Sequence, residues 1–406
     1  MEVKYLDSLY LDDFLTLFEK KMSSQNPLKL EQLSDGVIIP LIEKQGMAYA
    51  GVLNASSESV KSANFEPLNH LDGYGLSAEI LEEINLDNLS FMEGSFIYLG
   101  RIRNHWGHFL MDSVSRLWPV LENENKNIEQ AQFIYFGEEI KSQSIIRFFE
   151  LLGINKTQLH YISRPTRFSQ LTVPQAAFIP GKMVHEKFLL PFNQIIKQLQ
   201  LPENQQPTKI YLSRAKLKGI NEWGEPAIEK CFEKNGFQII YPETLSLDEQ
   251  IKWLQSADTI ACLSGTLAHT LVFAKQATRL IVINKSYKRE NYRQSGIDEI
   301  KKLQVTYIDS HISLAPVFAG GPFWIKKSPN LTRFIKDNQW LETEEFQDHR
   351  YRILFQMLGK IILLYVRIFR GSRKNPVKVI NTYNLYQDKI KLSQLFNFYF
   401  PLIFKK

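Results

Sequence analysis

Apolar and polar residues alternate in short blocks from residue 95 onward, and the period of the pattern changes from block to block. Runs rich in β-branched and aromatic residues predict strands, and apolar residues spaced three or four apart predict amphipathic helices. The first half reads strand, helix, strand, helix, strand, which is typical of a parallel sheet covered by helices. We expect strands 95–102, 132–137 and 159–163 and helices 105–121 and 141–154, with Asn104 capping the first helix.

A second alternation of the same kind follows a polar, proline-bounded linker at 201–207. It predicts strands 208–214, 237–242, 258–265 and 279–284 and helices 225–236, 246–257 and 266–276, with Ser246 as a cap. A helix is also expected over 184–201. We therefore expect an α/β protein with domains at 1–204 and 205–343 that face each other across a cleft.

The first 90 residues carry weaker signals than the rest of the chain. A short amphipathic stretch covers 9–21, and strand-like pieces lie at 37–40 and 48–53. The initial residues contain acids where a signal peptide has a basic stretch, so a cytoplasmic location is expected.

Composition narrows the class of protein. Of the 406 residues, 44% are hydrophobic and 23% are charged, which is typical of a globular protein and excludes a disordered chain. Two cysteines, Cys231 and Cys262, are too few for a disulfide framework or a four-cysteine zinc site, and they indicate a reducing compartment.

Charge is divided unevenly along the chain. The net charge is +6, but twelve Lys and Arg against the single acid Asp388 give residues 350–406 a charge of +11, which leaves −5 for residues 1–349. In the tail, 344–406, the segment 353–369 has the composition of an amphipathic helix that lies on an anionic membrane. A C-terminal helix packed on the body is the open alternative. A nucleic-acid partner is disfavoured, because the body is acidic and contains no recognition module.

The predicted helix 105–121 is apolar except for one row of polar side chains. His105, His108, Asp112 and Arg116 are three or four residues apart and share one face. A polar row on such a helix is stable when it faces a cleft or is paired, and α/β folds bind ligands where such a helix begins. Asp112 with His108 would then form a general base for a hydroxyl nucleophile. The alternative is that Asp112 pairs with Arg116 or His108 only to hold the helix in place.

The loop after strand 208–214 carries the residue types of a phosphate site. Arg214 ends the strand, and Lys216 and Lys218 follow it, so the loop has the charges that would clamp a diphosphate. Asn221 and Glu222 come next. A solvated basic loop is the alternative.

Two further segments of the second half point to a donor ligand. Ser264, Gly265 and Thr266 form a small-residue turn from strand to helix, which leaves backbone N–H groups for an anion, and His269 lies one helical turn later. Glu243 stands at another strand end, where a carboxylate would accept two sugar hydroxyls. The alternatives are an ordinary turn, a core histidine and a helix-capping acid.

The order of these motifs resembles glycosyltransferase family 61, which includes bacterial capsular polysaccharide biosynthesis proteins and eukaryotic xylosyl- and N-acetylglucosaminyltransferases. The motifs are HWGHFLMDSVSRLW, KIYLSRAKLKGINE, GFQIIYPETLSLDEQI and SADTIACLSGTLAHTLVFA, all within residues 95–310. The resemblance implies a GT-B-like fold with two Rossmann-like domains, inverting transfer from a nucleotide sugar, and no obligatory metal ion or other cofactor.

The resemblance also implies roles for single residues. His105, His108 and Asp112 would lie on the acceptor side, with Asp112 as the base. The donor side would be formed by Ser213, Arg214, Lys218, Asn221, Glu222, Glu243, Ser264, Gly265, Thr266 and His269.

We therefore expect an inverting glycosyltransferase that acts in capsular or other cell-surface polysaccharide biosynthesis at the inner face of the cell membrane. Its partners would be a nucleotide-sugar donor, an oligosaccharide or lipid-linked glycan acceptor, and an anionic membrane surface that the tail contacts. The alternative is a non-catalytic, membrane-associated scaffold of a polysaccharide assembly complex.

Overall fold

The structure is a computed structural model of the chain. It describes residues 4–7, 11–12, 15–16, 20–44, 47–68, 73–84, 89–122, 128–201, 208–217, 222–286, 291–312 and 323–343. The basic tail 344–406, most of the linker, and the candidates Lys218 and Asn221 lie outside the described residues. In the described part of the chain, no helix is both long and apolar enough to cross a membrane.

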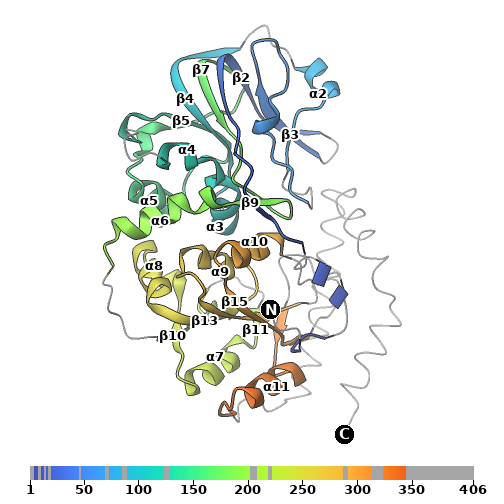
Figure 1. Cartoon of the computed structure of the whole chain (residues 1–406), viewed down its shortest axis with the longest axis vertical. Helices are drawn as coiled ribbons and strands as arrows, with labels where there is room; N and C mark the ends of the chain where they lie inside the picture. The colour runs from blue at the N-terminus through green and yellow to red at the C-terminus, as the bar shows by residue number, and fades with distance from the viewer. Residues whose placement is uncertain are drawn as a thin grey trace.

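The first half of the chain forms a six-stranded mixed sheet (Figure 1). The three strands predicted at 95–102, 132–137 and 159–163 pair in parallel as β4, β5 and β6, which confirms the predicted parallel arrangement. β7 joins β4 in parallel, and β2 and β3 continue the sheet in antiparallel pairing. In spatial order the strands are β3 (Met47–Leu53), β2 (Leu30–Lys44), β7 (Thr166–Pro174), β4 (Ser90–Ile102), β5 (Phe133–Gly137) and β6 (Leu159–Tyr161).

The second half forms a five-stranded sheet in which every pair is parallel. In spatial order its strands are β12 (Gln238–Ile240), β10 (Thr208–Leu212), β13 (Ala257–Leu263), β14 (Arg279–Asn284) and β15 (Gln304–Asp309). The chain runs from β10 outward to β12 and then returns past β10 to β13. The direction of winding therefore reverses between β10 and β13, and such a reversal opens a crevice at the carboxyl ends of the two strands.

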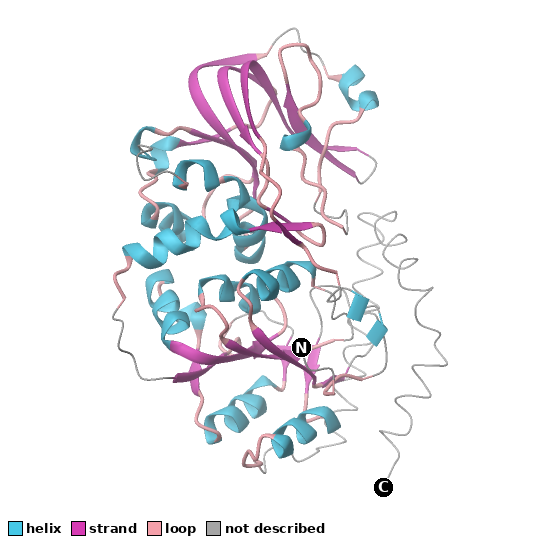
Figure 2. Cartoon of the chain, in the orientation of Figure 1, coloured by secondary structure: helices cyan, strands magenta, loops and turns pink. Residues whose placement is uncertain are grey.

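The elements stack in layers along the long axis of the molecule (Figures 1 and 2). One continuous hydrophobic core joins a face of each sheet through the helices that lie between them. The helices of the first half are α2 (Ala78–Glu83), α3 (Trp106–His108), α4 (Trp118–Leu121), α5 (Gln143–Leu151) and α6 (Leu190–Gln198). The helices of the second half are α7 (Glu225–Lys234), α8 (Leu247–Ser256), α9 (Thr266–His269), α10 (Tyr292–Ile300) and α11 (Pro329–Asp337). Helices α7 and α11 cover the outer face of the second sheet.

Two small sheets complete the fold. The first joins β1 (Ser23–Ser24), β9 (Met183–His185) and β8 (Phe178–Ile179). The second joins β11 (Glu222–Trp223), β17 (Phe323–Ile325) and β16 (His311–Ile312).

The two halves are packed directly on each other. Phe273 of the second half lies with its ring centroid 5.1 Å from that of Phe192 and 6.4 Å from that of Phe148, both of the first half. On the surface, the Arg147 guanidinium donates to both carboxylate oxygens of Asp248 at 2.9 and 2.7 Å. Aromatic burial of this kind fixes how the two halves meet. The division into domains at residue 205 and the GT-B arrangement remain predictions.

The first described residues of the chain lie against its far end. The backbone N–H of Asp7 donates to Asp309 at 2.8 Å, and the side-chain amide of Asn330 donates to Asp7 at 2.7 Å. The Tyr5 hydroxyl donates to Asp337 of α11 at 2.9 Å. Residues 4–7 therefore form a strap on the second half, although the 1–204 segment was predicted to belong to the first.

The predicted helix 105–121 is not a single regular helix. Three residues of α3 are followed by a π-helical turn at Phe109–Ser113, a 3-10 turn at Val114–Arg116, and then α4. His105, not Asn104, stands at the N-cap position of α3. The Asn104 side chain instead accepts the backbone N–H groups of Lys141 and Ser142, so the capping prediction was wrong.

The change of helix type turns Arg116 away from Asp112. Its guanidinium is buried, with 1% of the residue exposed, and donates to the backbone carbonyls of Ser62 at 2.7 Å, Ala63 at 2.8 Å and Pro174. It also lies 5.2 Å from the ring centroid of Tyr98. The predicted single row of four polar side chains is therefore wrong for Arg116, whose two terminal nitrogens donate four hydrogen bonds to carbonyls inside the first half.

We expect Arg116→Met to lower the free energy of unfolding by about 3 kcal/mol or more, because several buried carbonyls lose a charged donor. Arg147→Met removes the same charge from an exposed ion pair and should cost about 1 kcal/mol or less. Thermal and denaturant unfolding of both variants measure the difference. Equal losses would mean that the Arg116 network does not stabilise the first half.

Candidate functional site

The two halves of the chain are in close contact at Gly107. A Cβ atom built on Gly107 would lie 3.0 Å from Cγ2 of Thr266 and 3.2 Å from Cδ2 of His269. Both distances are shorter than side chains normally allow, so only glycine lets α3 approach α9 this closely. The junction brings the motif 105–112 into direct contact with the motif 264–269, whereas the sequence predicted a cleft between the two halves.

Asp112 connects the halves through a bidentate ion pair. Arg293 of α10 donates from Nε to Oδ1 at 3.0 Å and from its terminal nitrogen to Oδ2 at 2.9 Å. Nδ1 of His108 lies 2.9 Å from the same Oδ2. A carboxylate held by a guanidinium is ionised and only accepts, so His108 donates from Nδ1 and its basic lone pair is on Nε2. The π-helical turn places Asp112 where both contacts form.

His105 lies beside this pair. Its ring centroid is 5.0 Å from that of His108, with the rings nearly perpendicular. Partial desolvation lowers the pKa of His105, and electrostatic interactions with His108, Arg103 and Arg214 lower it further. The effect of Arg214 shows that the charge of the second half reaches the histidines of the first.

The carboxyl ends of β10, β13 and β14 carry a second charged cluster, at the reversal point of the sheet. Glu222 is buried and accepts from the Arg214 guanidinium at 3.0 Å and from the ammonium of Lys285. The Lys285 ammonium lies 3.4 Å from where a Cβ of Gly265 would be, and the Lys285 backbone N–H donates to Ser264 Oγ at 3.3 Å. Burial lowers the pKa of Lys285, and the charge of Glu222 opposes that shift.

Gly265 has a backbone conformation that only glycine adopts readily, with φ 128° and ψ −150°. It lets the chain turn from β13 into α9 beside the Lys285 ammonium. The predicted helix 266–276 is shorter than expected, because α9 has four residues and continues as a 3-10 turn over Thr270–Phe273. The positive charge at this turn therefore comes from the Lys285 ammonium more than from the N-terminus of the short helix α9.

Three carboxylates lie behind this edge of the sheet. Glu225 accepts from the Arg214 backbone N–H at 3.2 Å and from the Tyr211 hydroxyl at 3.1 Å. Burial raises the pKa of Glu225 to about 8. Together with Glu222 and Glu229, it fixes the loop that carries Arg214.

The remaining donor-side candidates have other surroundings. Ser213 is fully buried and donates to Glu229, so its hydroxyl is used inside the second half. Glu243 is exposed in the 3-10 turn Pro242–Thr244 that follows the edge strand β12. The cap predicted at Ser246 is confirmed, and its reciprocal partner is Glu249.

His269 begins a buried row of hydrogen bonds. Its Nδ1 lies 3.0 Å from Oε1 of Gln294, and the Gln294 amide donates to Asp298 at 2.7 Å. The Tyr307 hydroxyl donates to the other oxygen of Asp298 at 2.6 Å. Because the Gln294 amide nitrogen faces Asp298, its oxygen accepts from His269, which fixes the proton on Nδ1.

Burial lowers the pKa of His269 to about 4, and Arg293 adds to this effect while Asp112 opposes it. Burial raises the pKa of Asp298 to about 7, although the hydrogen bonds from Tyr307 and Gln294 lower it. The junction is thus held with a neutral imidazole at neutral pH.

Sequence reasoning missed Lys285, Arg293, Arg101 and Arg103. Lys285 follows β14 directly, and its place at a strand end is a signal that the pattern contained. Arg101 and Arg103 end β4 in the same way. Arg293 lies in α10, whose sequence gives no sign that it reaches the first half.

Across the part of the chain that the structure describes, no group of three or more His, Cys, Asp and Glu is arranged to hold a metal ion.

We expect His269→Gln to flatten the acid side of the stability profile. The pKa of His269 is about 6.5 in the unfolded chain and about 4 in the folded protein. The contribution of His269 to the free energy of unfolding is therefore complete above pH 6.5 and is lost as the pH falls toward 4. Between pH 7 and pH 5 the variant should lose about 2 kcal/mol less than the unmodified protein. Thermal unfolding at both pH values measures this. Asp298 is present in both proteins, so its own titration affects both equally. If the two plots of stability against pH were parallel, the lowered pKa of His269 would be contradicted.

The chain was compared with curated proteins and with family models. No curated protein matches it. Residues 106–281, which run from α3 into β14 and hold residues of both halves of the candidate site, match the family model Glycosyltransferase 61, and this segment is therefore similar to that glycosyltransferase family.

Proposed function

We propose that the protein transfers a sugar, with inversion at its anomeric carbon, from a nucleotide-sugar donor to a glycan acceptor. The family match supports glycosyl transfer. The observation that carries the proposal is the contact of Gly107 with Thr266 and His269, because it sets the His108–Asp112 pair beside the cation-bearing edge of the second sheet.

The second half would bind the donor. Arg214 follows β10 and Lys285 follows β14, on the two sides of β13 and next to the reversal point where parallel sheets bind ligands. Their charges suit a diphosphate, and in a site shielded from water they would stabilise the negative charge of the leaving nucleoside diphosphate. On this account protein cations supply the charge, and we propose that no metal ion is required.

The first half would supply the proton acceptor. The sequence suggested Asp112 as the base, but both of its oxygens already accept hydrogen bonds. We therefore propose that His108 Nε2 takes the proton from the acceptor hydroxyl while Asp112 orients the ring. The acceptor oxygen forms the bond to the anomeric carbon, the bond from that carbon to the diphosphate oxygen breaks, and the electron pair leaves with the diphosphate.

The cellular setting is part of the proposal. A role in capsular or other cell-surface polysaccharide biosynthesis rests on the family resemblance. Attachment to the inner face of the membrane rests on the charge of +11 that residues 350–406 carry.

Turnover should depend on the His108–Asp112 pair. After a thermal-shift screen of nucleoside diphosphate sugars identifies the donor, His108→Ala and Asp112→Asn should each lower kcat by about 100-fold or more and leave donor affinity unchanged. Arg293→Met is the control, since it breaks the ion pair between the halves but keeps both members of the pair. An equal loss in Arg293→Met would mean that Asp112 acts by joining the halves. Full activity of His108→Ala would refute its role as base.

Donor affinity should depend on Lys285. Lys285→Met should weaken binding of the donor by about 10-fold to 100-fold, the effect of removing one charged hydrogen bond. Lys275→Met is the matched control, because Lys275 makes an exposed ion pair with Asp258 in the same half. Calorimetric titration with the nucleoside diphosphate measures both. Tight binding without transfer to any acceptor would favour the scaffold alternative.

A further inference from the structure

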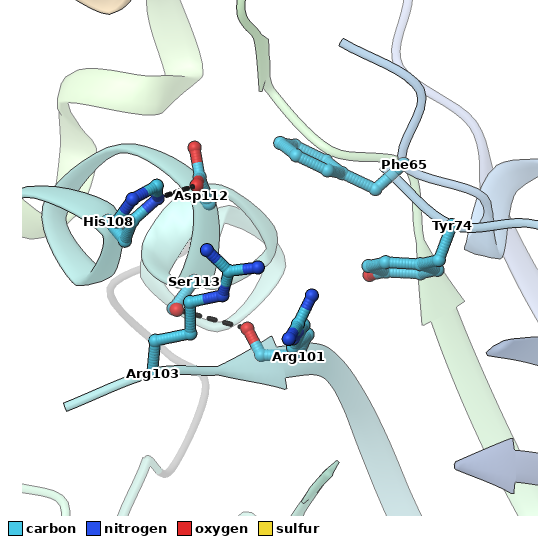
Figure 3. A pocket seen from close by; sticks show the side chains of 7 residues that line it. All are labelled: Phe65, Tyr74, Arg101, Arg103, His108, Asp112 and Ser113. Atoms are coloured by element: carbon cyan, nitrogen blue, oxygen red, sulfur yellow. Dashed lines mark hydrogen bonds and ion pairs between the residues drawn. The ribbon is translucent and has the colours of Figure 1, made fainter. Parts of the chain in front are cut away.

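A small pocket opens on the first half beside the His108–Asp112 pair, and neither Arg214 nor Lys285 lines it. Arg101 and Arg103 from the end of β4 form one wall of the pocket; the Arg103 guanidinium points toward the pair, and the Arg101 side chain lies near Tyr74 (Figure 3). The lining residues are Phe65, Tyr74, Arg101, Arg103, His108, Asp112 and Ser113.

The lining is electropositive. It contains two guanidinium groups and one carboxylate, and that carboxylate, Asp112, is already bound on both oxygens by the guanidinium of Arg293. The charges of Arg103 and Arg101 also act on Glu138, whose pKa is lowered first by a hydrogen bond from the Asn104 backbone. Glu138 itself accepts from Asn104 at 2.9 Å.

The backbone places the two arginines firmly. The Ser113 hydroxyl donates to the carbonyl of Arg101 at 3.0 Å, which ties the end of β4 to the π-helical turn that carries Asp112 (Figure 3). Arg103 therefore emerges next to the pair and not on a separate loop. A ligand held by these arginines would lie within reach of the same histidine that the mechanism uses.

The opposite wall is aromatic. The rings of Phe65 and Tyr74 stack with centroids 5.9 Å apart, on two strands of backbone that exchange hydrogen bonds of 3.0 and 2.7 Å. Tyr74 packs in turn on Phe136 of β5 at 5.4 Å. Both rings are buried, so this wall is fixed, and the small pocket has room for an anionic group of a ligand and not for a whole sugar ring.

We propose that this pocket binds an anionic group of the acceptor, a carboxylate or a phosphate, through Arg101 and Arg103. Guanidinium groups bind the paired oxygens of both anions in a bidentate manner. The acceptor would thus be an acidic sugar or a sugar phosphate and not a neutral glycan. The inference rests on the proposed function, because it names the acceptor of that site.

The test measures binding to the full chain by calorimetric titration, which needs no transfer reaction. The probes are a disaccharide ending in glucuronic acid, the same disaccharide with its carboxyl reduced to an alcohol, and glucose 1-phosphate. At least one charged probe should bind tenfold or more tightly than the neutral one, and the stronger of the two identifies the anion.

Arg103→Met should reduce that preference by tenfold or more, and Arg103→Lys should retain part of it, since lysine keeps the charge but not the planar fork. The control is Arg164→Met, an exposed arginine that does not line the pocket. Equal affinity for charged and neutral probes would overturn the proposal. A second result would also overturn it: uridine diphosphate displaces the charged probe, and Arg103→Met loses as much affinity for uridine diphosphate as for the probe. The pocket would then bind the donor and not the acceptor.

Failure of the proposed function gives a different result. If Lys285→Met leaves nucleotide binding intact, the donor assignment is wrong, yet the preference for charged probes would still report on the arginine pocket.

Discussion

The candidate site depends on the close packing of Gly107 against the side chains of Thr266 and His269. Because a Cβ there would meet Thr266 at 3.0 Å, a larger residue would force that side chain to shift by a few tenths of an ångström. The ion pair of Asp112 with Arg293 and the orientation of His108 both form across that same contact. Tightly packed interiors do not absorb such a shift locally, so the geometry of the charged groups follows from the absence of one side chain.

Each half of the site contains a carboxylate that holds two donor side chains in place. In the first half Asp112 orients a histidine and an arginine, and in the second half Glu222 orients Arg214 and Lys285. A buried carboxylate with two cationic or donor partners holds long side chains in one rotamer and offsets the cost of taking their charges out of water. The two clusters are linked electrostatically, because the charge of Arg214 acts on His105.

The sequence predicted the parallel strands and the Ser246 cap, because strand periodicity and cap motifs are local properties. It did not predict that Arg116 turns inward, since a π-helical turn after His108 changes the register of every later residue. Nor did it predict Arg293, whose partner is 181 positions away in the chain. Lys218 and Asn221 lie outside the described residues, so their donor roles remain predictions.

The strap formed by residues 4–7 has a consequence for how the protein is made. Its partners Asp309, Asn330 and Asp337 leave the ribosome long after the strap does. During synthesis the start of the chain must therefore wait, unassembled, until some three hundred later residues have been added, as the sequence separation of 302 between Asp7 and Asp309 requires. The second half is therefore complete only after residues 4–7 dock onto segments that are synthesised about three hundred residues later.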